Sequence, residues 1–168
     1  ALAALGQFIV APVASPGPAP EGDLIAPKAG ALGGLTPEEV RGIIDRSITL
    51  ANQTRGNIRL PLGTRAKFVI AVADLDGQII GLHRMKDATV FSIDVSVAKS
   101  RNVIYFSGAA RQASELPGVP ANTAVTNRTL GFGAQPLYPP GIDFTEPGPF
   151  FPLYQFDVVA RSGDAGVS

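Results

Sequence analysis

The first strong pattern in the chain is an apolar stripe at helical spacing over residues 36–54. Thr36, Pro37 and Glu39 form a helix start, because threonine can cap, proline suits the first helical position and the glutamate completes a capping box. The apolar positions that share one face of this helix are Val40, Ile43, Ile44, Ile48 and Ala51. We therefore expect an amphipathic helix that ends near residues 54–56.

The pattern then changes to the period of β-strands. Residues 66–74 are rich in Val, Ile and Phe and predict a mostly buried strand. Asp76-Gly77 predicts a tight turn, because this pair favours the positive φ values of hairpins. Residues 78–85 alternate, with Ile79, Gly81, His83 and Met85 on one face and Ile80, Leu82 and Arg84 on the other. A β-hairpin is the expected result.

A second helix is predicted after the hairpin, running to about residue 106. Asp87 or Thr89 is the expected N-cap. Apolar residues occupy more than one face of this helix, so we expect it to be buried on two sides. One side would meet the sheet, and the other would meet a helix or a second subunit.

The flanks of this regular block are rich in proline and glycine. We expect an extended arm over residues 1–34, since proline interrupts any long helix there. The remaining residues, 35–168, are expected to form a single domain with a long Pro/Gly/aromatic loop at 117–152. The alternation of residues 154–161 predicts a last strand. The loop aromatics would either line a flat ligand or seal a subunit interface.

Composition narrows the function classes. Acidic and basic residues balance at 14 each, which gives no basic footprint for nucleic acid. No apolar run approaches the roughly 20 residues that span a bilayer. Cysteine is absent, which excludes disulfides and thiolate chemistry. An extracellular or periplasmic location is expected, with a cytoplasmic one as the alternative.

The hairpin and the helix after it resemble the GlcG/HbpS-like haem-binding family. The matching residues are Ala71-Val72-Ala73-Asp74, Asp76-Gly77, Arg84-Met85-Lys86-Asp87-Ala88 and Val97-Ala98-Lys99-Ser100. The resemblance covers residues 35–108, and the family's glycine in its "DGA" motif is replaced by Asp87. It implies a profilin-like α+β sandwich, with an antiparallel sheet of about five strands flanked by helices, in a homo-oligomer. Haem is the cofactor that it implies.

Four residues are candidates for ligand binding. Arg84 and Lys99 fall on family motif positions and could hold a carboxylate or a haem propionate, with Thr89 as a further contact. Their ordinary interpretation is that Arg84 pairs with an aspartate and that Lys99 solvates its helix. His83, the single imidazole, is either an axial haem ligand or general base, or an ordinary strand residue.

Metal binding and catalysis have less support in the residues. Asp74 and Asp76 invite a calcium interpretation, but a tight turn explains both, because the chain continues straight into a strand. No phosphate loop, nucleophile elbow or paired carboxylates occur. We therefore expect a non-catalytic module that binds haem or another small anionic molecule. The alternative is an assembly subunit of an exported or surface polymer, which joins copies through its arm and aromatic loop; an enzyme acting on a small hydroxy acid ranks last.

Overall fold

The computed structural model describes residues 19–155, and the statements below concern this part of the chain. Its elements are β1 (Gly22–Ile25), α1 (Pro37–Gln53), β2 (Val69–Ala73), β3 (Ile79–Arg84), α2 (Ser92–Ser107) and α3 (Asn127–Gly133). Residues 151–155 are also helical. The three strands form one antiparallel sheet in the order β1-β3-β2.

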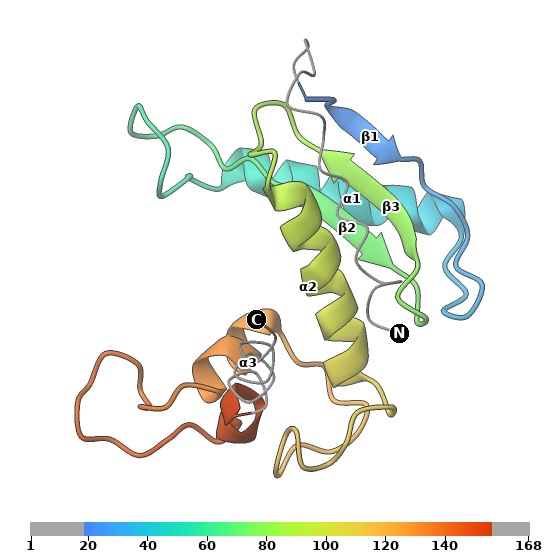
Figure 1. Ribbon diagram of the computed structural model, residues 1–168. Helices are drawn as coiled ribbons and strands as arrows, with labels where there is room; N and C mark the ends of the chain where they lie inside the picture. Colours follow the sequence, from blue (N-terminus) through green and yellow to red (C-terminus); the bar gives the residue numbers. More distant parts are fainter. Residues whose placement is uncertain (1–18, 156–168) are drawn as a thin grey trace, which may run out of the picture.

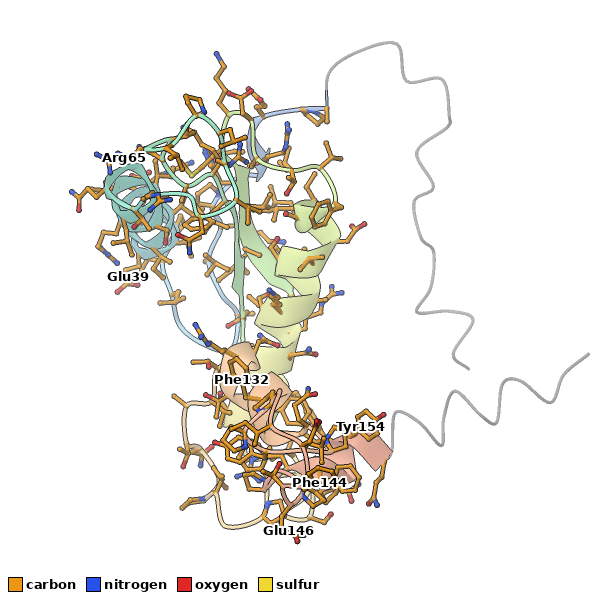
Figure 2. All side chains as sticks on the ribbon, turned by 90° about the vertical axis from the view of Figure 1, so that its left-hand side faces the viewer. Glu39, Arg65, Phe132, Phe144, Glu146 and Tyr154 are labelled. Carbon is orange, nitrogen blue, oxygen red and sulfur yellow. The ribbon has the colours of Figure 1, made fainter. Side chains whose placement is uncertain are left out.

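The sheet lies between two helices. Figure 1 shows α1 behind the strands and α2 in front of them, and the turned view of Figure 2 places the two helices on opposite sides of the sheet. The core on the α1 side joins Val40 and Ile44 of α1 to Val72 of β2 and Ile80 of β3. Both α1 residues are fully buried, so this helix is tightly packed onto the sheet.

The start and end of α1 are as the sequence predicts. The Thr36 hydroxyl accepts a hydrogen bond from the Glu39 backbone N–H at 3.2 Å, and the Glu39 carboxylate accepts one from the Thr36 N–H at 2.8 Å. This reciprocal pair is the predicted capping box. It satisfies two backbone N–H groups that would otherwise lack partners at the helix start.

The expected five-stranded, profilin-like sheet is wrong for this chain. The described residues contain three strands in an open sheet. One of them, β1, comes from the segment expected to be an extended arm, and it pairs with β3 from Gly22↔Arg84 to Ile25↔Leu82. Its four residues, Gly-Asp-Leu-Ile, are too few and too weakly alternating to be recognised as a strand by pattern. The broader α+β class remains correct.

The second predicted helix differs from expectation in its cap and in its burial. Helix α2 starts at Ser92 after Phe91, which makes no side-chain cap, so neither Asp87 nor Thr89 caps it. None of its 16 residues is buried. One side faces the sheet, while Val95 and Tyr105 of the helix and Phe91 just before it are exposed.

The chain beyond α2 forms a second, smaller cluster of apolar residues. Leu116, Val125, Leu130 and Phe150 are buried together around α3. The aromatic residues labelled in Figure 2 (Phe132, Phe144 and Tyr154) belong to this lobe, away from the sheet. The strand predicted at 154–161 is not found at its first two residues, which are helical, and the rest of it lies outside the described residues.

Asp74 joins the hairpin to the segment between β1 and α1. Its carboxylate accepts hydrogen bonds from the backbone N–H groups of Leu32 at 2.8 Å and Gly33 at 2.6 Å. The side chain is only 1% exposed. A Cβ atom at Gly30 or Gly33 would lie within 2.8 Å of this carboxylate, so both positions require glycine. The acidic residue considered for calcium is therefore a structural anchor.

Asp74 should make the fold sensitive to acid. The backbone hydrogen bond from Leu32 is the main cause that holds the pKa of this carboxyl below its ordinary value. The stabilisation is therefore complete above the unfolded-state pKa of about 4 and is lost as the pH falls through the lower folded-state pKa. Urea unfolding at a series of pH values between 3 and 7 should show this loss.

The Asp74→Asn variant tests whether this side chain is the cause. It should be less stable than the parent at pH 7 and should show a flatter decline toward pH 3. Asp76→Asn, which alters an exposed carboxylate two residues away, is the matched control. Identical acid profiles for the parent chain and Asp74→Asn would contradict the assignment.

Candidate functional site

The four predicted ligand-binding residues do not share a site. His83 and Arg84 are consecutive in β3, so their side chains point to opposite faces of the sheet. His83 faces α1, where its Nδ1 lies 2.7 Å from the Asp23 carboxylate. Arg41 of α1 bonds the same carboxylate. This hydrogen bond from Arg41, followed by the one from His83, lowers the pKa of Asp23.

Arg84 is engaged within the protein. Its guanidinium donates to the carbonyl oxygens of Ala88 at 2.9 Å, Ala19 at 2.9 Å and Pro20 at 3.1 Å. The residue is 7% exposed. Its nearest carboxylate is that of Glu21, at 3.7 Å, and not an aspartate of the following helix. The fork of donors is thus used to hold the chain before β1 against the chain before α2.

Lys99 and Thr89 are exposed on α2 and on the turn before it. The Thr89 hydroxyl pairs with the Ser92 hydroxyl at the start of the helix. Lys99 lies further along, and its backbone carbonyl accepts a bond from the Asn127 side-chain amide at 2.8 Å. Of the four predicted residues, Lys99 alone lines a hollow of the surface.

That hollow, which we name the β2 groove, follows the outer edge of the sheet. It has a volume of about 600 Å³ and opens along β2, with α1 as one wall and α2 as the other. Its floor is formed by residues 68–73. The walls consist of Ile43, Ser47 and Leu50 from α1 and of Ser96, Lys99, Ser100, Val103 and Ile104 from α2, with Asn127 at one end.

The chemistry of the β2 groove is that of a strand edge with apolar flanks. Since β2 is the last strand in the sheet order, its outer backbone N–H and C=O groups have no strand partner among residues 19–155. Lys99 is the one charged residue that lines the groove. An edge with neither proline nor an inward charge lacks the usual features that protect strand edges from pairing. The groove is therefore suited to an extended, apolar polypeptide.

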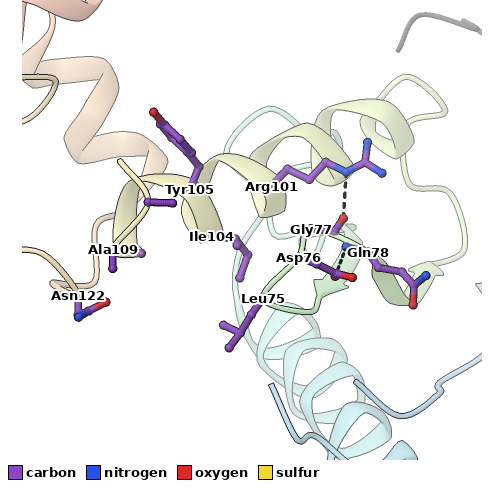
Figure 3. Close-up of a pocket in the computed structure, with 11 residues that line it drawn as sticks. Leu75, Asp76, Gly77, Gln78, Arg101, Ile104, Tyr105, Ala109 and Asn122 are labelled. Carbon is purple, nitrogen blue, oxygen red and sulfur yellow. Dashed lines mark hydrogen bonds between the residues drawn. The ribbon is translucent and has the colours of Figure 1, made fainter. Parts of the chain in front are cut away.

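A second hollow, of about 860 Å³, lies at the tip of the hairpin (Figure 3). Several of its polar groups have partners in the protein. The Arg101 Nε donates to the Gly77 carbonyl at 3.1 Å, and the Asp76 carboxylate accepts from the Gln78 N–H at 2.8 Å. The Tyr105 hydroxyl donates to the Glu115 carboxylate, which raises the pKa of Tyr105. Among the described residues, this hollow has no unpaired strand edge of the kind that the β2 groove offers.

Sequence reasoning missed both the β2 groove and the Asp23–His83–Arg41 cluster. The cluster depends on β1, whose four residues carry no clear strand pattern. The apolar residues on two faces of the second helix predicted a partner on its far side, and the groove along β2 was not part of that prediction. In the described ranges, no three or more acidic or histidine side chains are grouped to hold a metal ion. Nor is any helix there long and apolar enough to cross a bilayer.

Comparison with known proteins adds no assignment, since no family model, curated protein or solved structure matches the chain. Relationship to the GlcG/HbpS-like family stays a prediction from the motifs in residues 35–108. The expected extracellular or periplasmic location also stays a prediction. A proposal for function must therefore be based on the geometry.

Proposed function

We propose that this protein is a non-catalytic binding and assembly module, which takes an extended polypeptide segment along the open edge of β2. The observation that carries the proposal is the β2 groove, where an unpaired strand edge lies between apolar walls from two helices. Adding a strand to such an edge supplies backbone hydrogen bonds, and the side-chain walls supply specificity. The proposal shares self-assembly with the alternative suggested by the sequence, which used the arm and the aromatic loop as interfaces, and it adds the edge of β2 as a contact surface.

Exposed apolar side chains elsewhere support an assembly role. Ile58, Leu60 and Leu62 project from the loop between α1 and β2, each more than three-quarters exposed. Phe144 is fully exposed in the distal lobe. Large exposed apolar surface on a soluble domain commonly marks contacts with other chains. Copies of this chain carry no net charge, so no long-range repulsion opposes their association.

A charge placed in the groove should weaken self-association. Leu50 lines the α1 wall and is 62% exposed, so lysine can replace it without disturbing the core. We expect Leu50→Lys to raise the dissociation constant of the oligomer about tenfold, the equivalent of roughly 1.4 kcal/mol. Light scattering over a dilution series measures this constant.

Leu75→Lys is the matched control, because Leu75 is also 62% exposed but lies outside the β2 groove. Its association should equal that of the parent chain. Thermal unfolding of both variants shows whether the fold is retained. Equal masses for the parent and Leu50→Lys at every concentration would refute assembly through this edge.

A small anionic ligand, haem included, is the second candidate, and Lys99 favours it. This lysine is the single charged residue on the groove walls, where its ammonium can pair with a carboxylate. His83 lies on the α1 face bonded to Asp23 and does not line the groove, so it would not act as the axial ligand there. The apolar walls suit a flat ring system.

Hemin titration tests this second candidate. A shift of the Soret band should appear in the parent chain, and Lys99→Ala should weaken binding about tenfold through loss of the ion pair. Lys86→Ala, at an exposed position outside the groove, should bind as the parent does. The absence of any Soret shift, or equal affinities for all three proteins, rules out haem in this groove.

A further inference from the structure

We propose that the strand which fills the β2 groove is the N-terminal segment 7–11 of a second copy of this chain. The inference rests on the proposed function and names its partner. Residues 7–11 lie outside the described part of the chain, so the argument uses their sequence and the position at which the described chain begins. The result would be a fourth strand, donated by the neighbour, on the open edge of the sheet.

The chemistry of the segment matches the groove. A strand between α1 and α2 would meet mostly apolar side chains on both faces, with three serines and Lys99 among them, so a mostly apolar segment suits the groove. Residues 7–11 read Gln-Phe-Ile-Val-Ala, which places Phe8 and Val10 on one face and Ile9 and Ala11 on the other. The first 20 residues contain no charged side chain. Pro12 then ends the paired stretch, because proline has no N–H for a ladder.

The anchor of the arm lies at the same end of the sheet as the start of β2, but across β3 from the groove. Arg84 donates to the carbonyl oxygens of Ala19 and Pro20, and in the sheet register Arg84 is opposite Val69, the first residue of β2. The arm therefore leaves the body at the end of the sheet where β2 begins. Its direction there is set by a buried arginine and not by surface contacts.

The spacer between this anchor and the strand favours a neighbour over the same chain. Residues 12–18 contain three prolines, and Pro20 follows. Proline-rich linkers are extended at about 3.1 Å per residue, so seven residues span roughly 22 Å. The five residues of β2 span about 17 Å. In the proposed assembly segment 7–11 reaches the β2 edge of another molecule, since in its own molecule that edge lies across β3 from the anchor of the arm.

Cysteine cross-linking in the 168-residue chain tests the pairing, since this chain has no cysteine. Two variants, Ile9→Cys and Ala71→Cys, are mixed, oxidised and separated without reductant. We expect a disulfide-linked heterodimer to form at least tenfold faster than from Ile9→Cys mixed with Thr49→Cys. Thr49 is an exposed residue of α1 outside the groove. Val10→Cys repeats the test for the other face of the strand, and equal rates in all mixtures overturn the proposal.

The source of the strand is tested separately. A single chain that carries both Ile9→Cys and Ala71→Cys should give linked dimers and larger species; a product that runs only as a monomer overturns the assignment to a neighbour. A chain that lacks residues 1–18 should have a lower mass by light scattering. It should bind a synthetic peptide of residues 5–14 and not a scrambled one, with Leu50→Lys reducing that binding about tenfold.

Failure of this inference and failure of the proposed function give different results. If Leu50→Lys dissociates the oligomer but removal of residues 1–18 leaves its mass unchanged, the groove takes another strand and the inference alone is overturned. If neither change affects the mass, assembly through the β2 edge is overturned, and the donated strand with it. If Leu50→Lys and the removal of residues 1–18 each lower the mass of the oligomer, both the proposed function and the donated strand are supported.

Discussion

Replacing Arg84 with alanine is expected to lower the free energy of unfolding by about 3 kcal/mol. The guanidinium is 7% exposed and donates to three carbonyl oxygens, those of Ala19, Pro20 and Ala88. Its removal leaves these acceptors with neither a protein partner nor full access to water. Because the bonds join the chain before β1 to the chain before α2, β1 should also lose protection against amide hydrogen exchange.

Two further variants separate a structural role from a charge effect. Arg101→Ala removes an exposed arginine that makes one bond to a backbone carbonyl, and it should change stability by about 0.5 kcal/mol or less. Arg84→Lys keeps the charge but lacks the planar fork of the guanidinium. Its loss in free energy of unfolding should therefore lie between the losses of Arg84→Ala and Arg101→Ala. Urea unfolding measures all three. An Arg84→Ala variant as stable as Arg101→Ala would show that this network contributes little.

Arg84 also illustrates what the sequence could not decide. The alternation placed Arg84 at the end of a strand. An arginine there could bind either a ligand or another part of the protein. The choice depended on residues 19–20, which are brought to Arg84 only because β1 pairs with β3. That pairing joins residues about 60 positions apart in the sequence, and no local pattern encodes it.

Local sequence patterns correctly predicted the features that depend on residues close together in the chain. The capping box of α1 and the turn at Asp76-Gly77 were predicted, and the structure contains both. The hairpin was predicted within a few residues of its observed ends. The cap and the turn depend on residues within about four positions of one another, and the hairpin pairs nearby segments joined by that turn. The number of strands depends on distant pairing, and that part of the prediction was wrong.

Asp87 shows how a departure from a motif can be judged on geometry. The family pattern has glycine at this position, and the structure gives Asp87 a φ of 62°. This left-handed region is one that glycine enters freely and aspartate tolerates. The Asp87 backbone N–H donates to the Glu21 carboxylate at 2.9 Å, and its carbonyl accepts from Arg59 at 2.8 Å. The substitution thus retains the turn, while membership of the family is still a prediction.

The candidate site was predictable only in part. Lys99 was selected from its motif, and it does line the β2 groove. The groove itself arises because α1 and α2 lie on opposite faces of the sheet and both extend past its edge strand. Sequence reasoning did infer that the second helix needs a partner on each side. It could not show that a groove between the two helices follows the edge of β2.

The predicted alternation in β3 was correct in part. Gly81, His83 and Met85 share one face, as predicted, and this face meets α1, but Ile80 joins the same core. The register shifts between Val72 and Ala73, so Ile80 is an extra residue opposite that step. A β-bulge of this kind changes the side to which a side chain points. The same region contains the tightest approach between α1 and the sheet.

Gly81→Ala is expected to destabilise the fold by about 2 kcal/mol, although the change adds a single methyl group. An ideal Cβ at this position would lie 2.7 Å from the Val40 Cγ1 and 3.2 Å from the Ile44 Cδ1. Both side chains are fully buried, and valine has one preferred rotamer in a helix, so neither can turn away. Helix α1 must move off the sheet, and the α1 wall of the β2 groove moves with it. Thermal and urea unfolding measure the loss.

Combining Gly81→Ala with a smaller residue at position 40 tests whether the predicted clash with Val40 is the cause. Val40→Ala removes the methyl group that the new Cβ would meet, so the double variant should be more stable than the sum of the two single losses predicts, by about 1 kcal/mol. Gly131→Ala is the control, because nothing lies within 4 Å of its Cβ position in α3. That variant should gain up to about 1 kcal/mol from helix propensity. Two results would contradict this explanation. One is an equal change in stability for Gly81→Ala and Gly131→Ala, and the other is a double variant whose loss of stability equals the sum of the losses for Gly81→Ala and Val40→Ala. Either result would mean that the close packing of α1 on β3 is not the reason why residue 81 must be glycine.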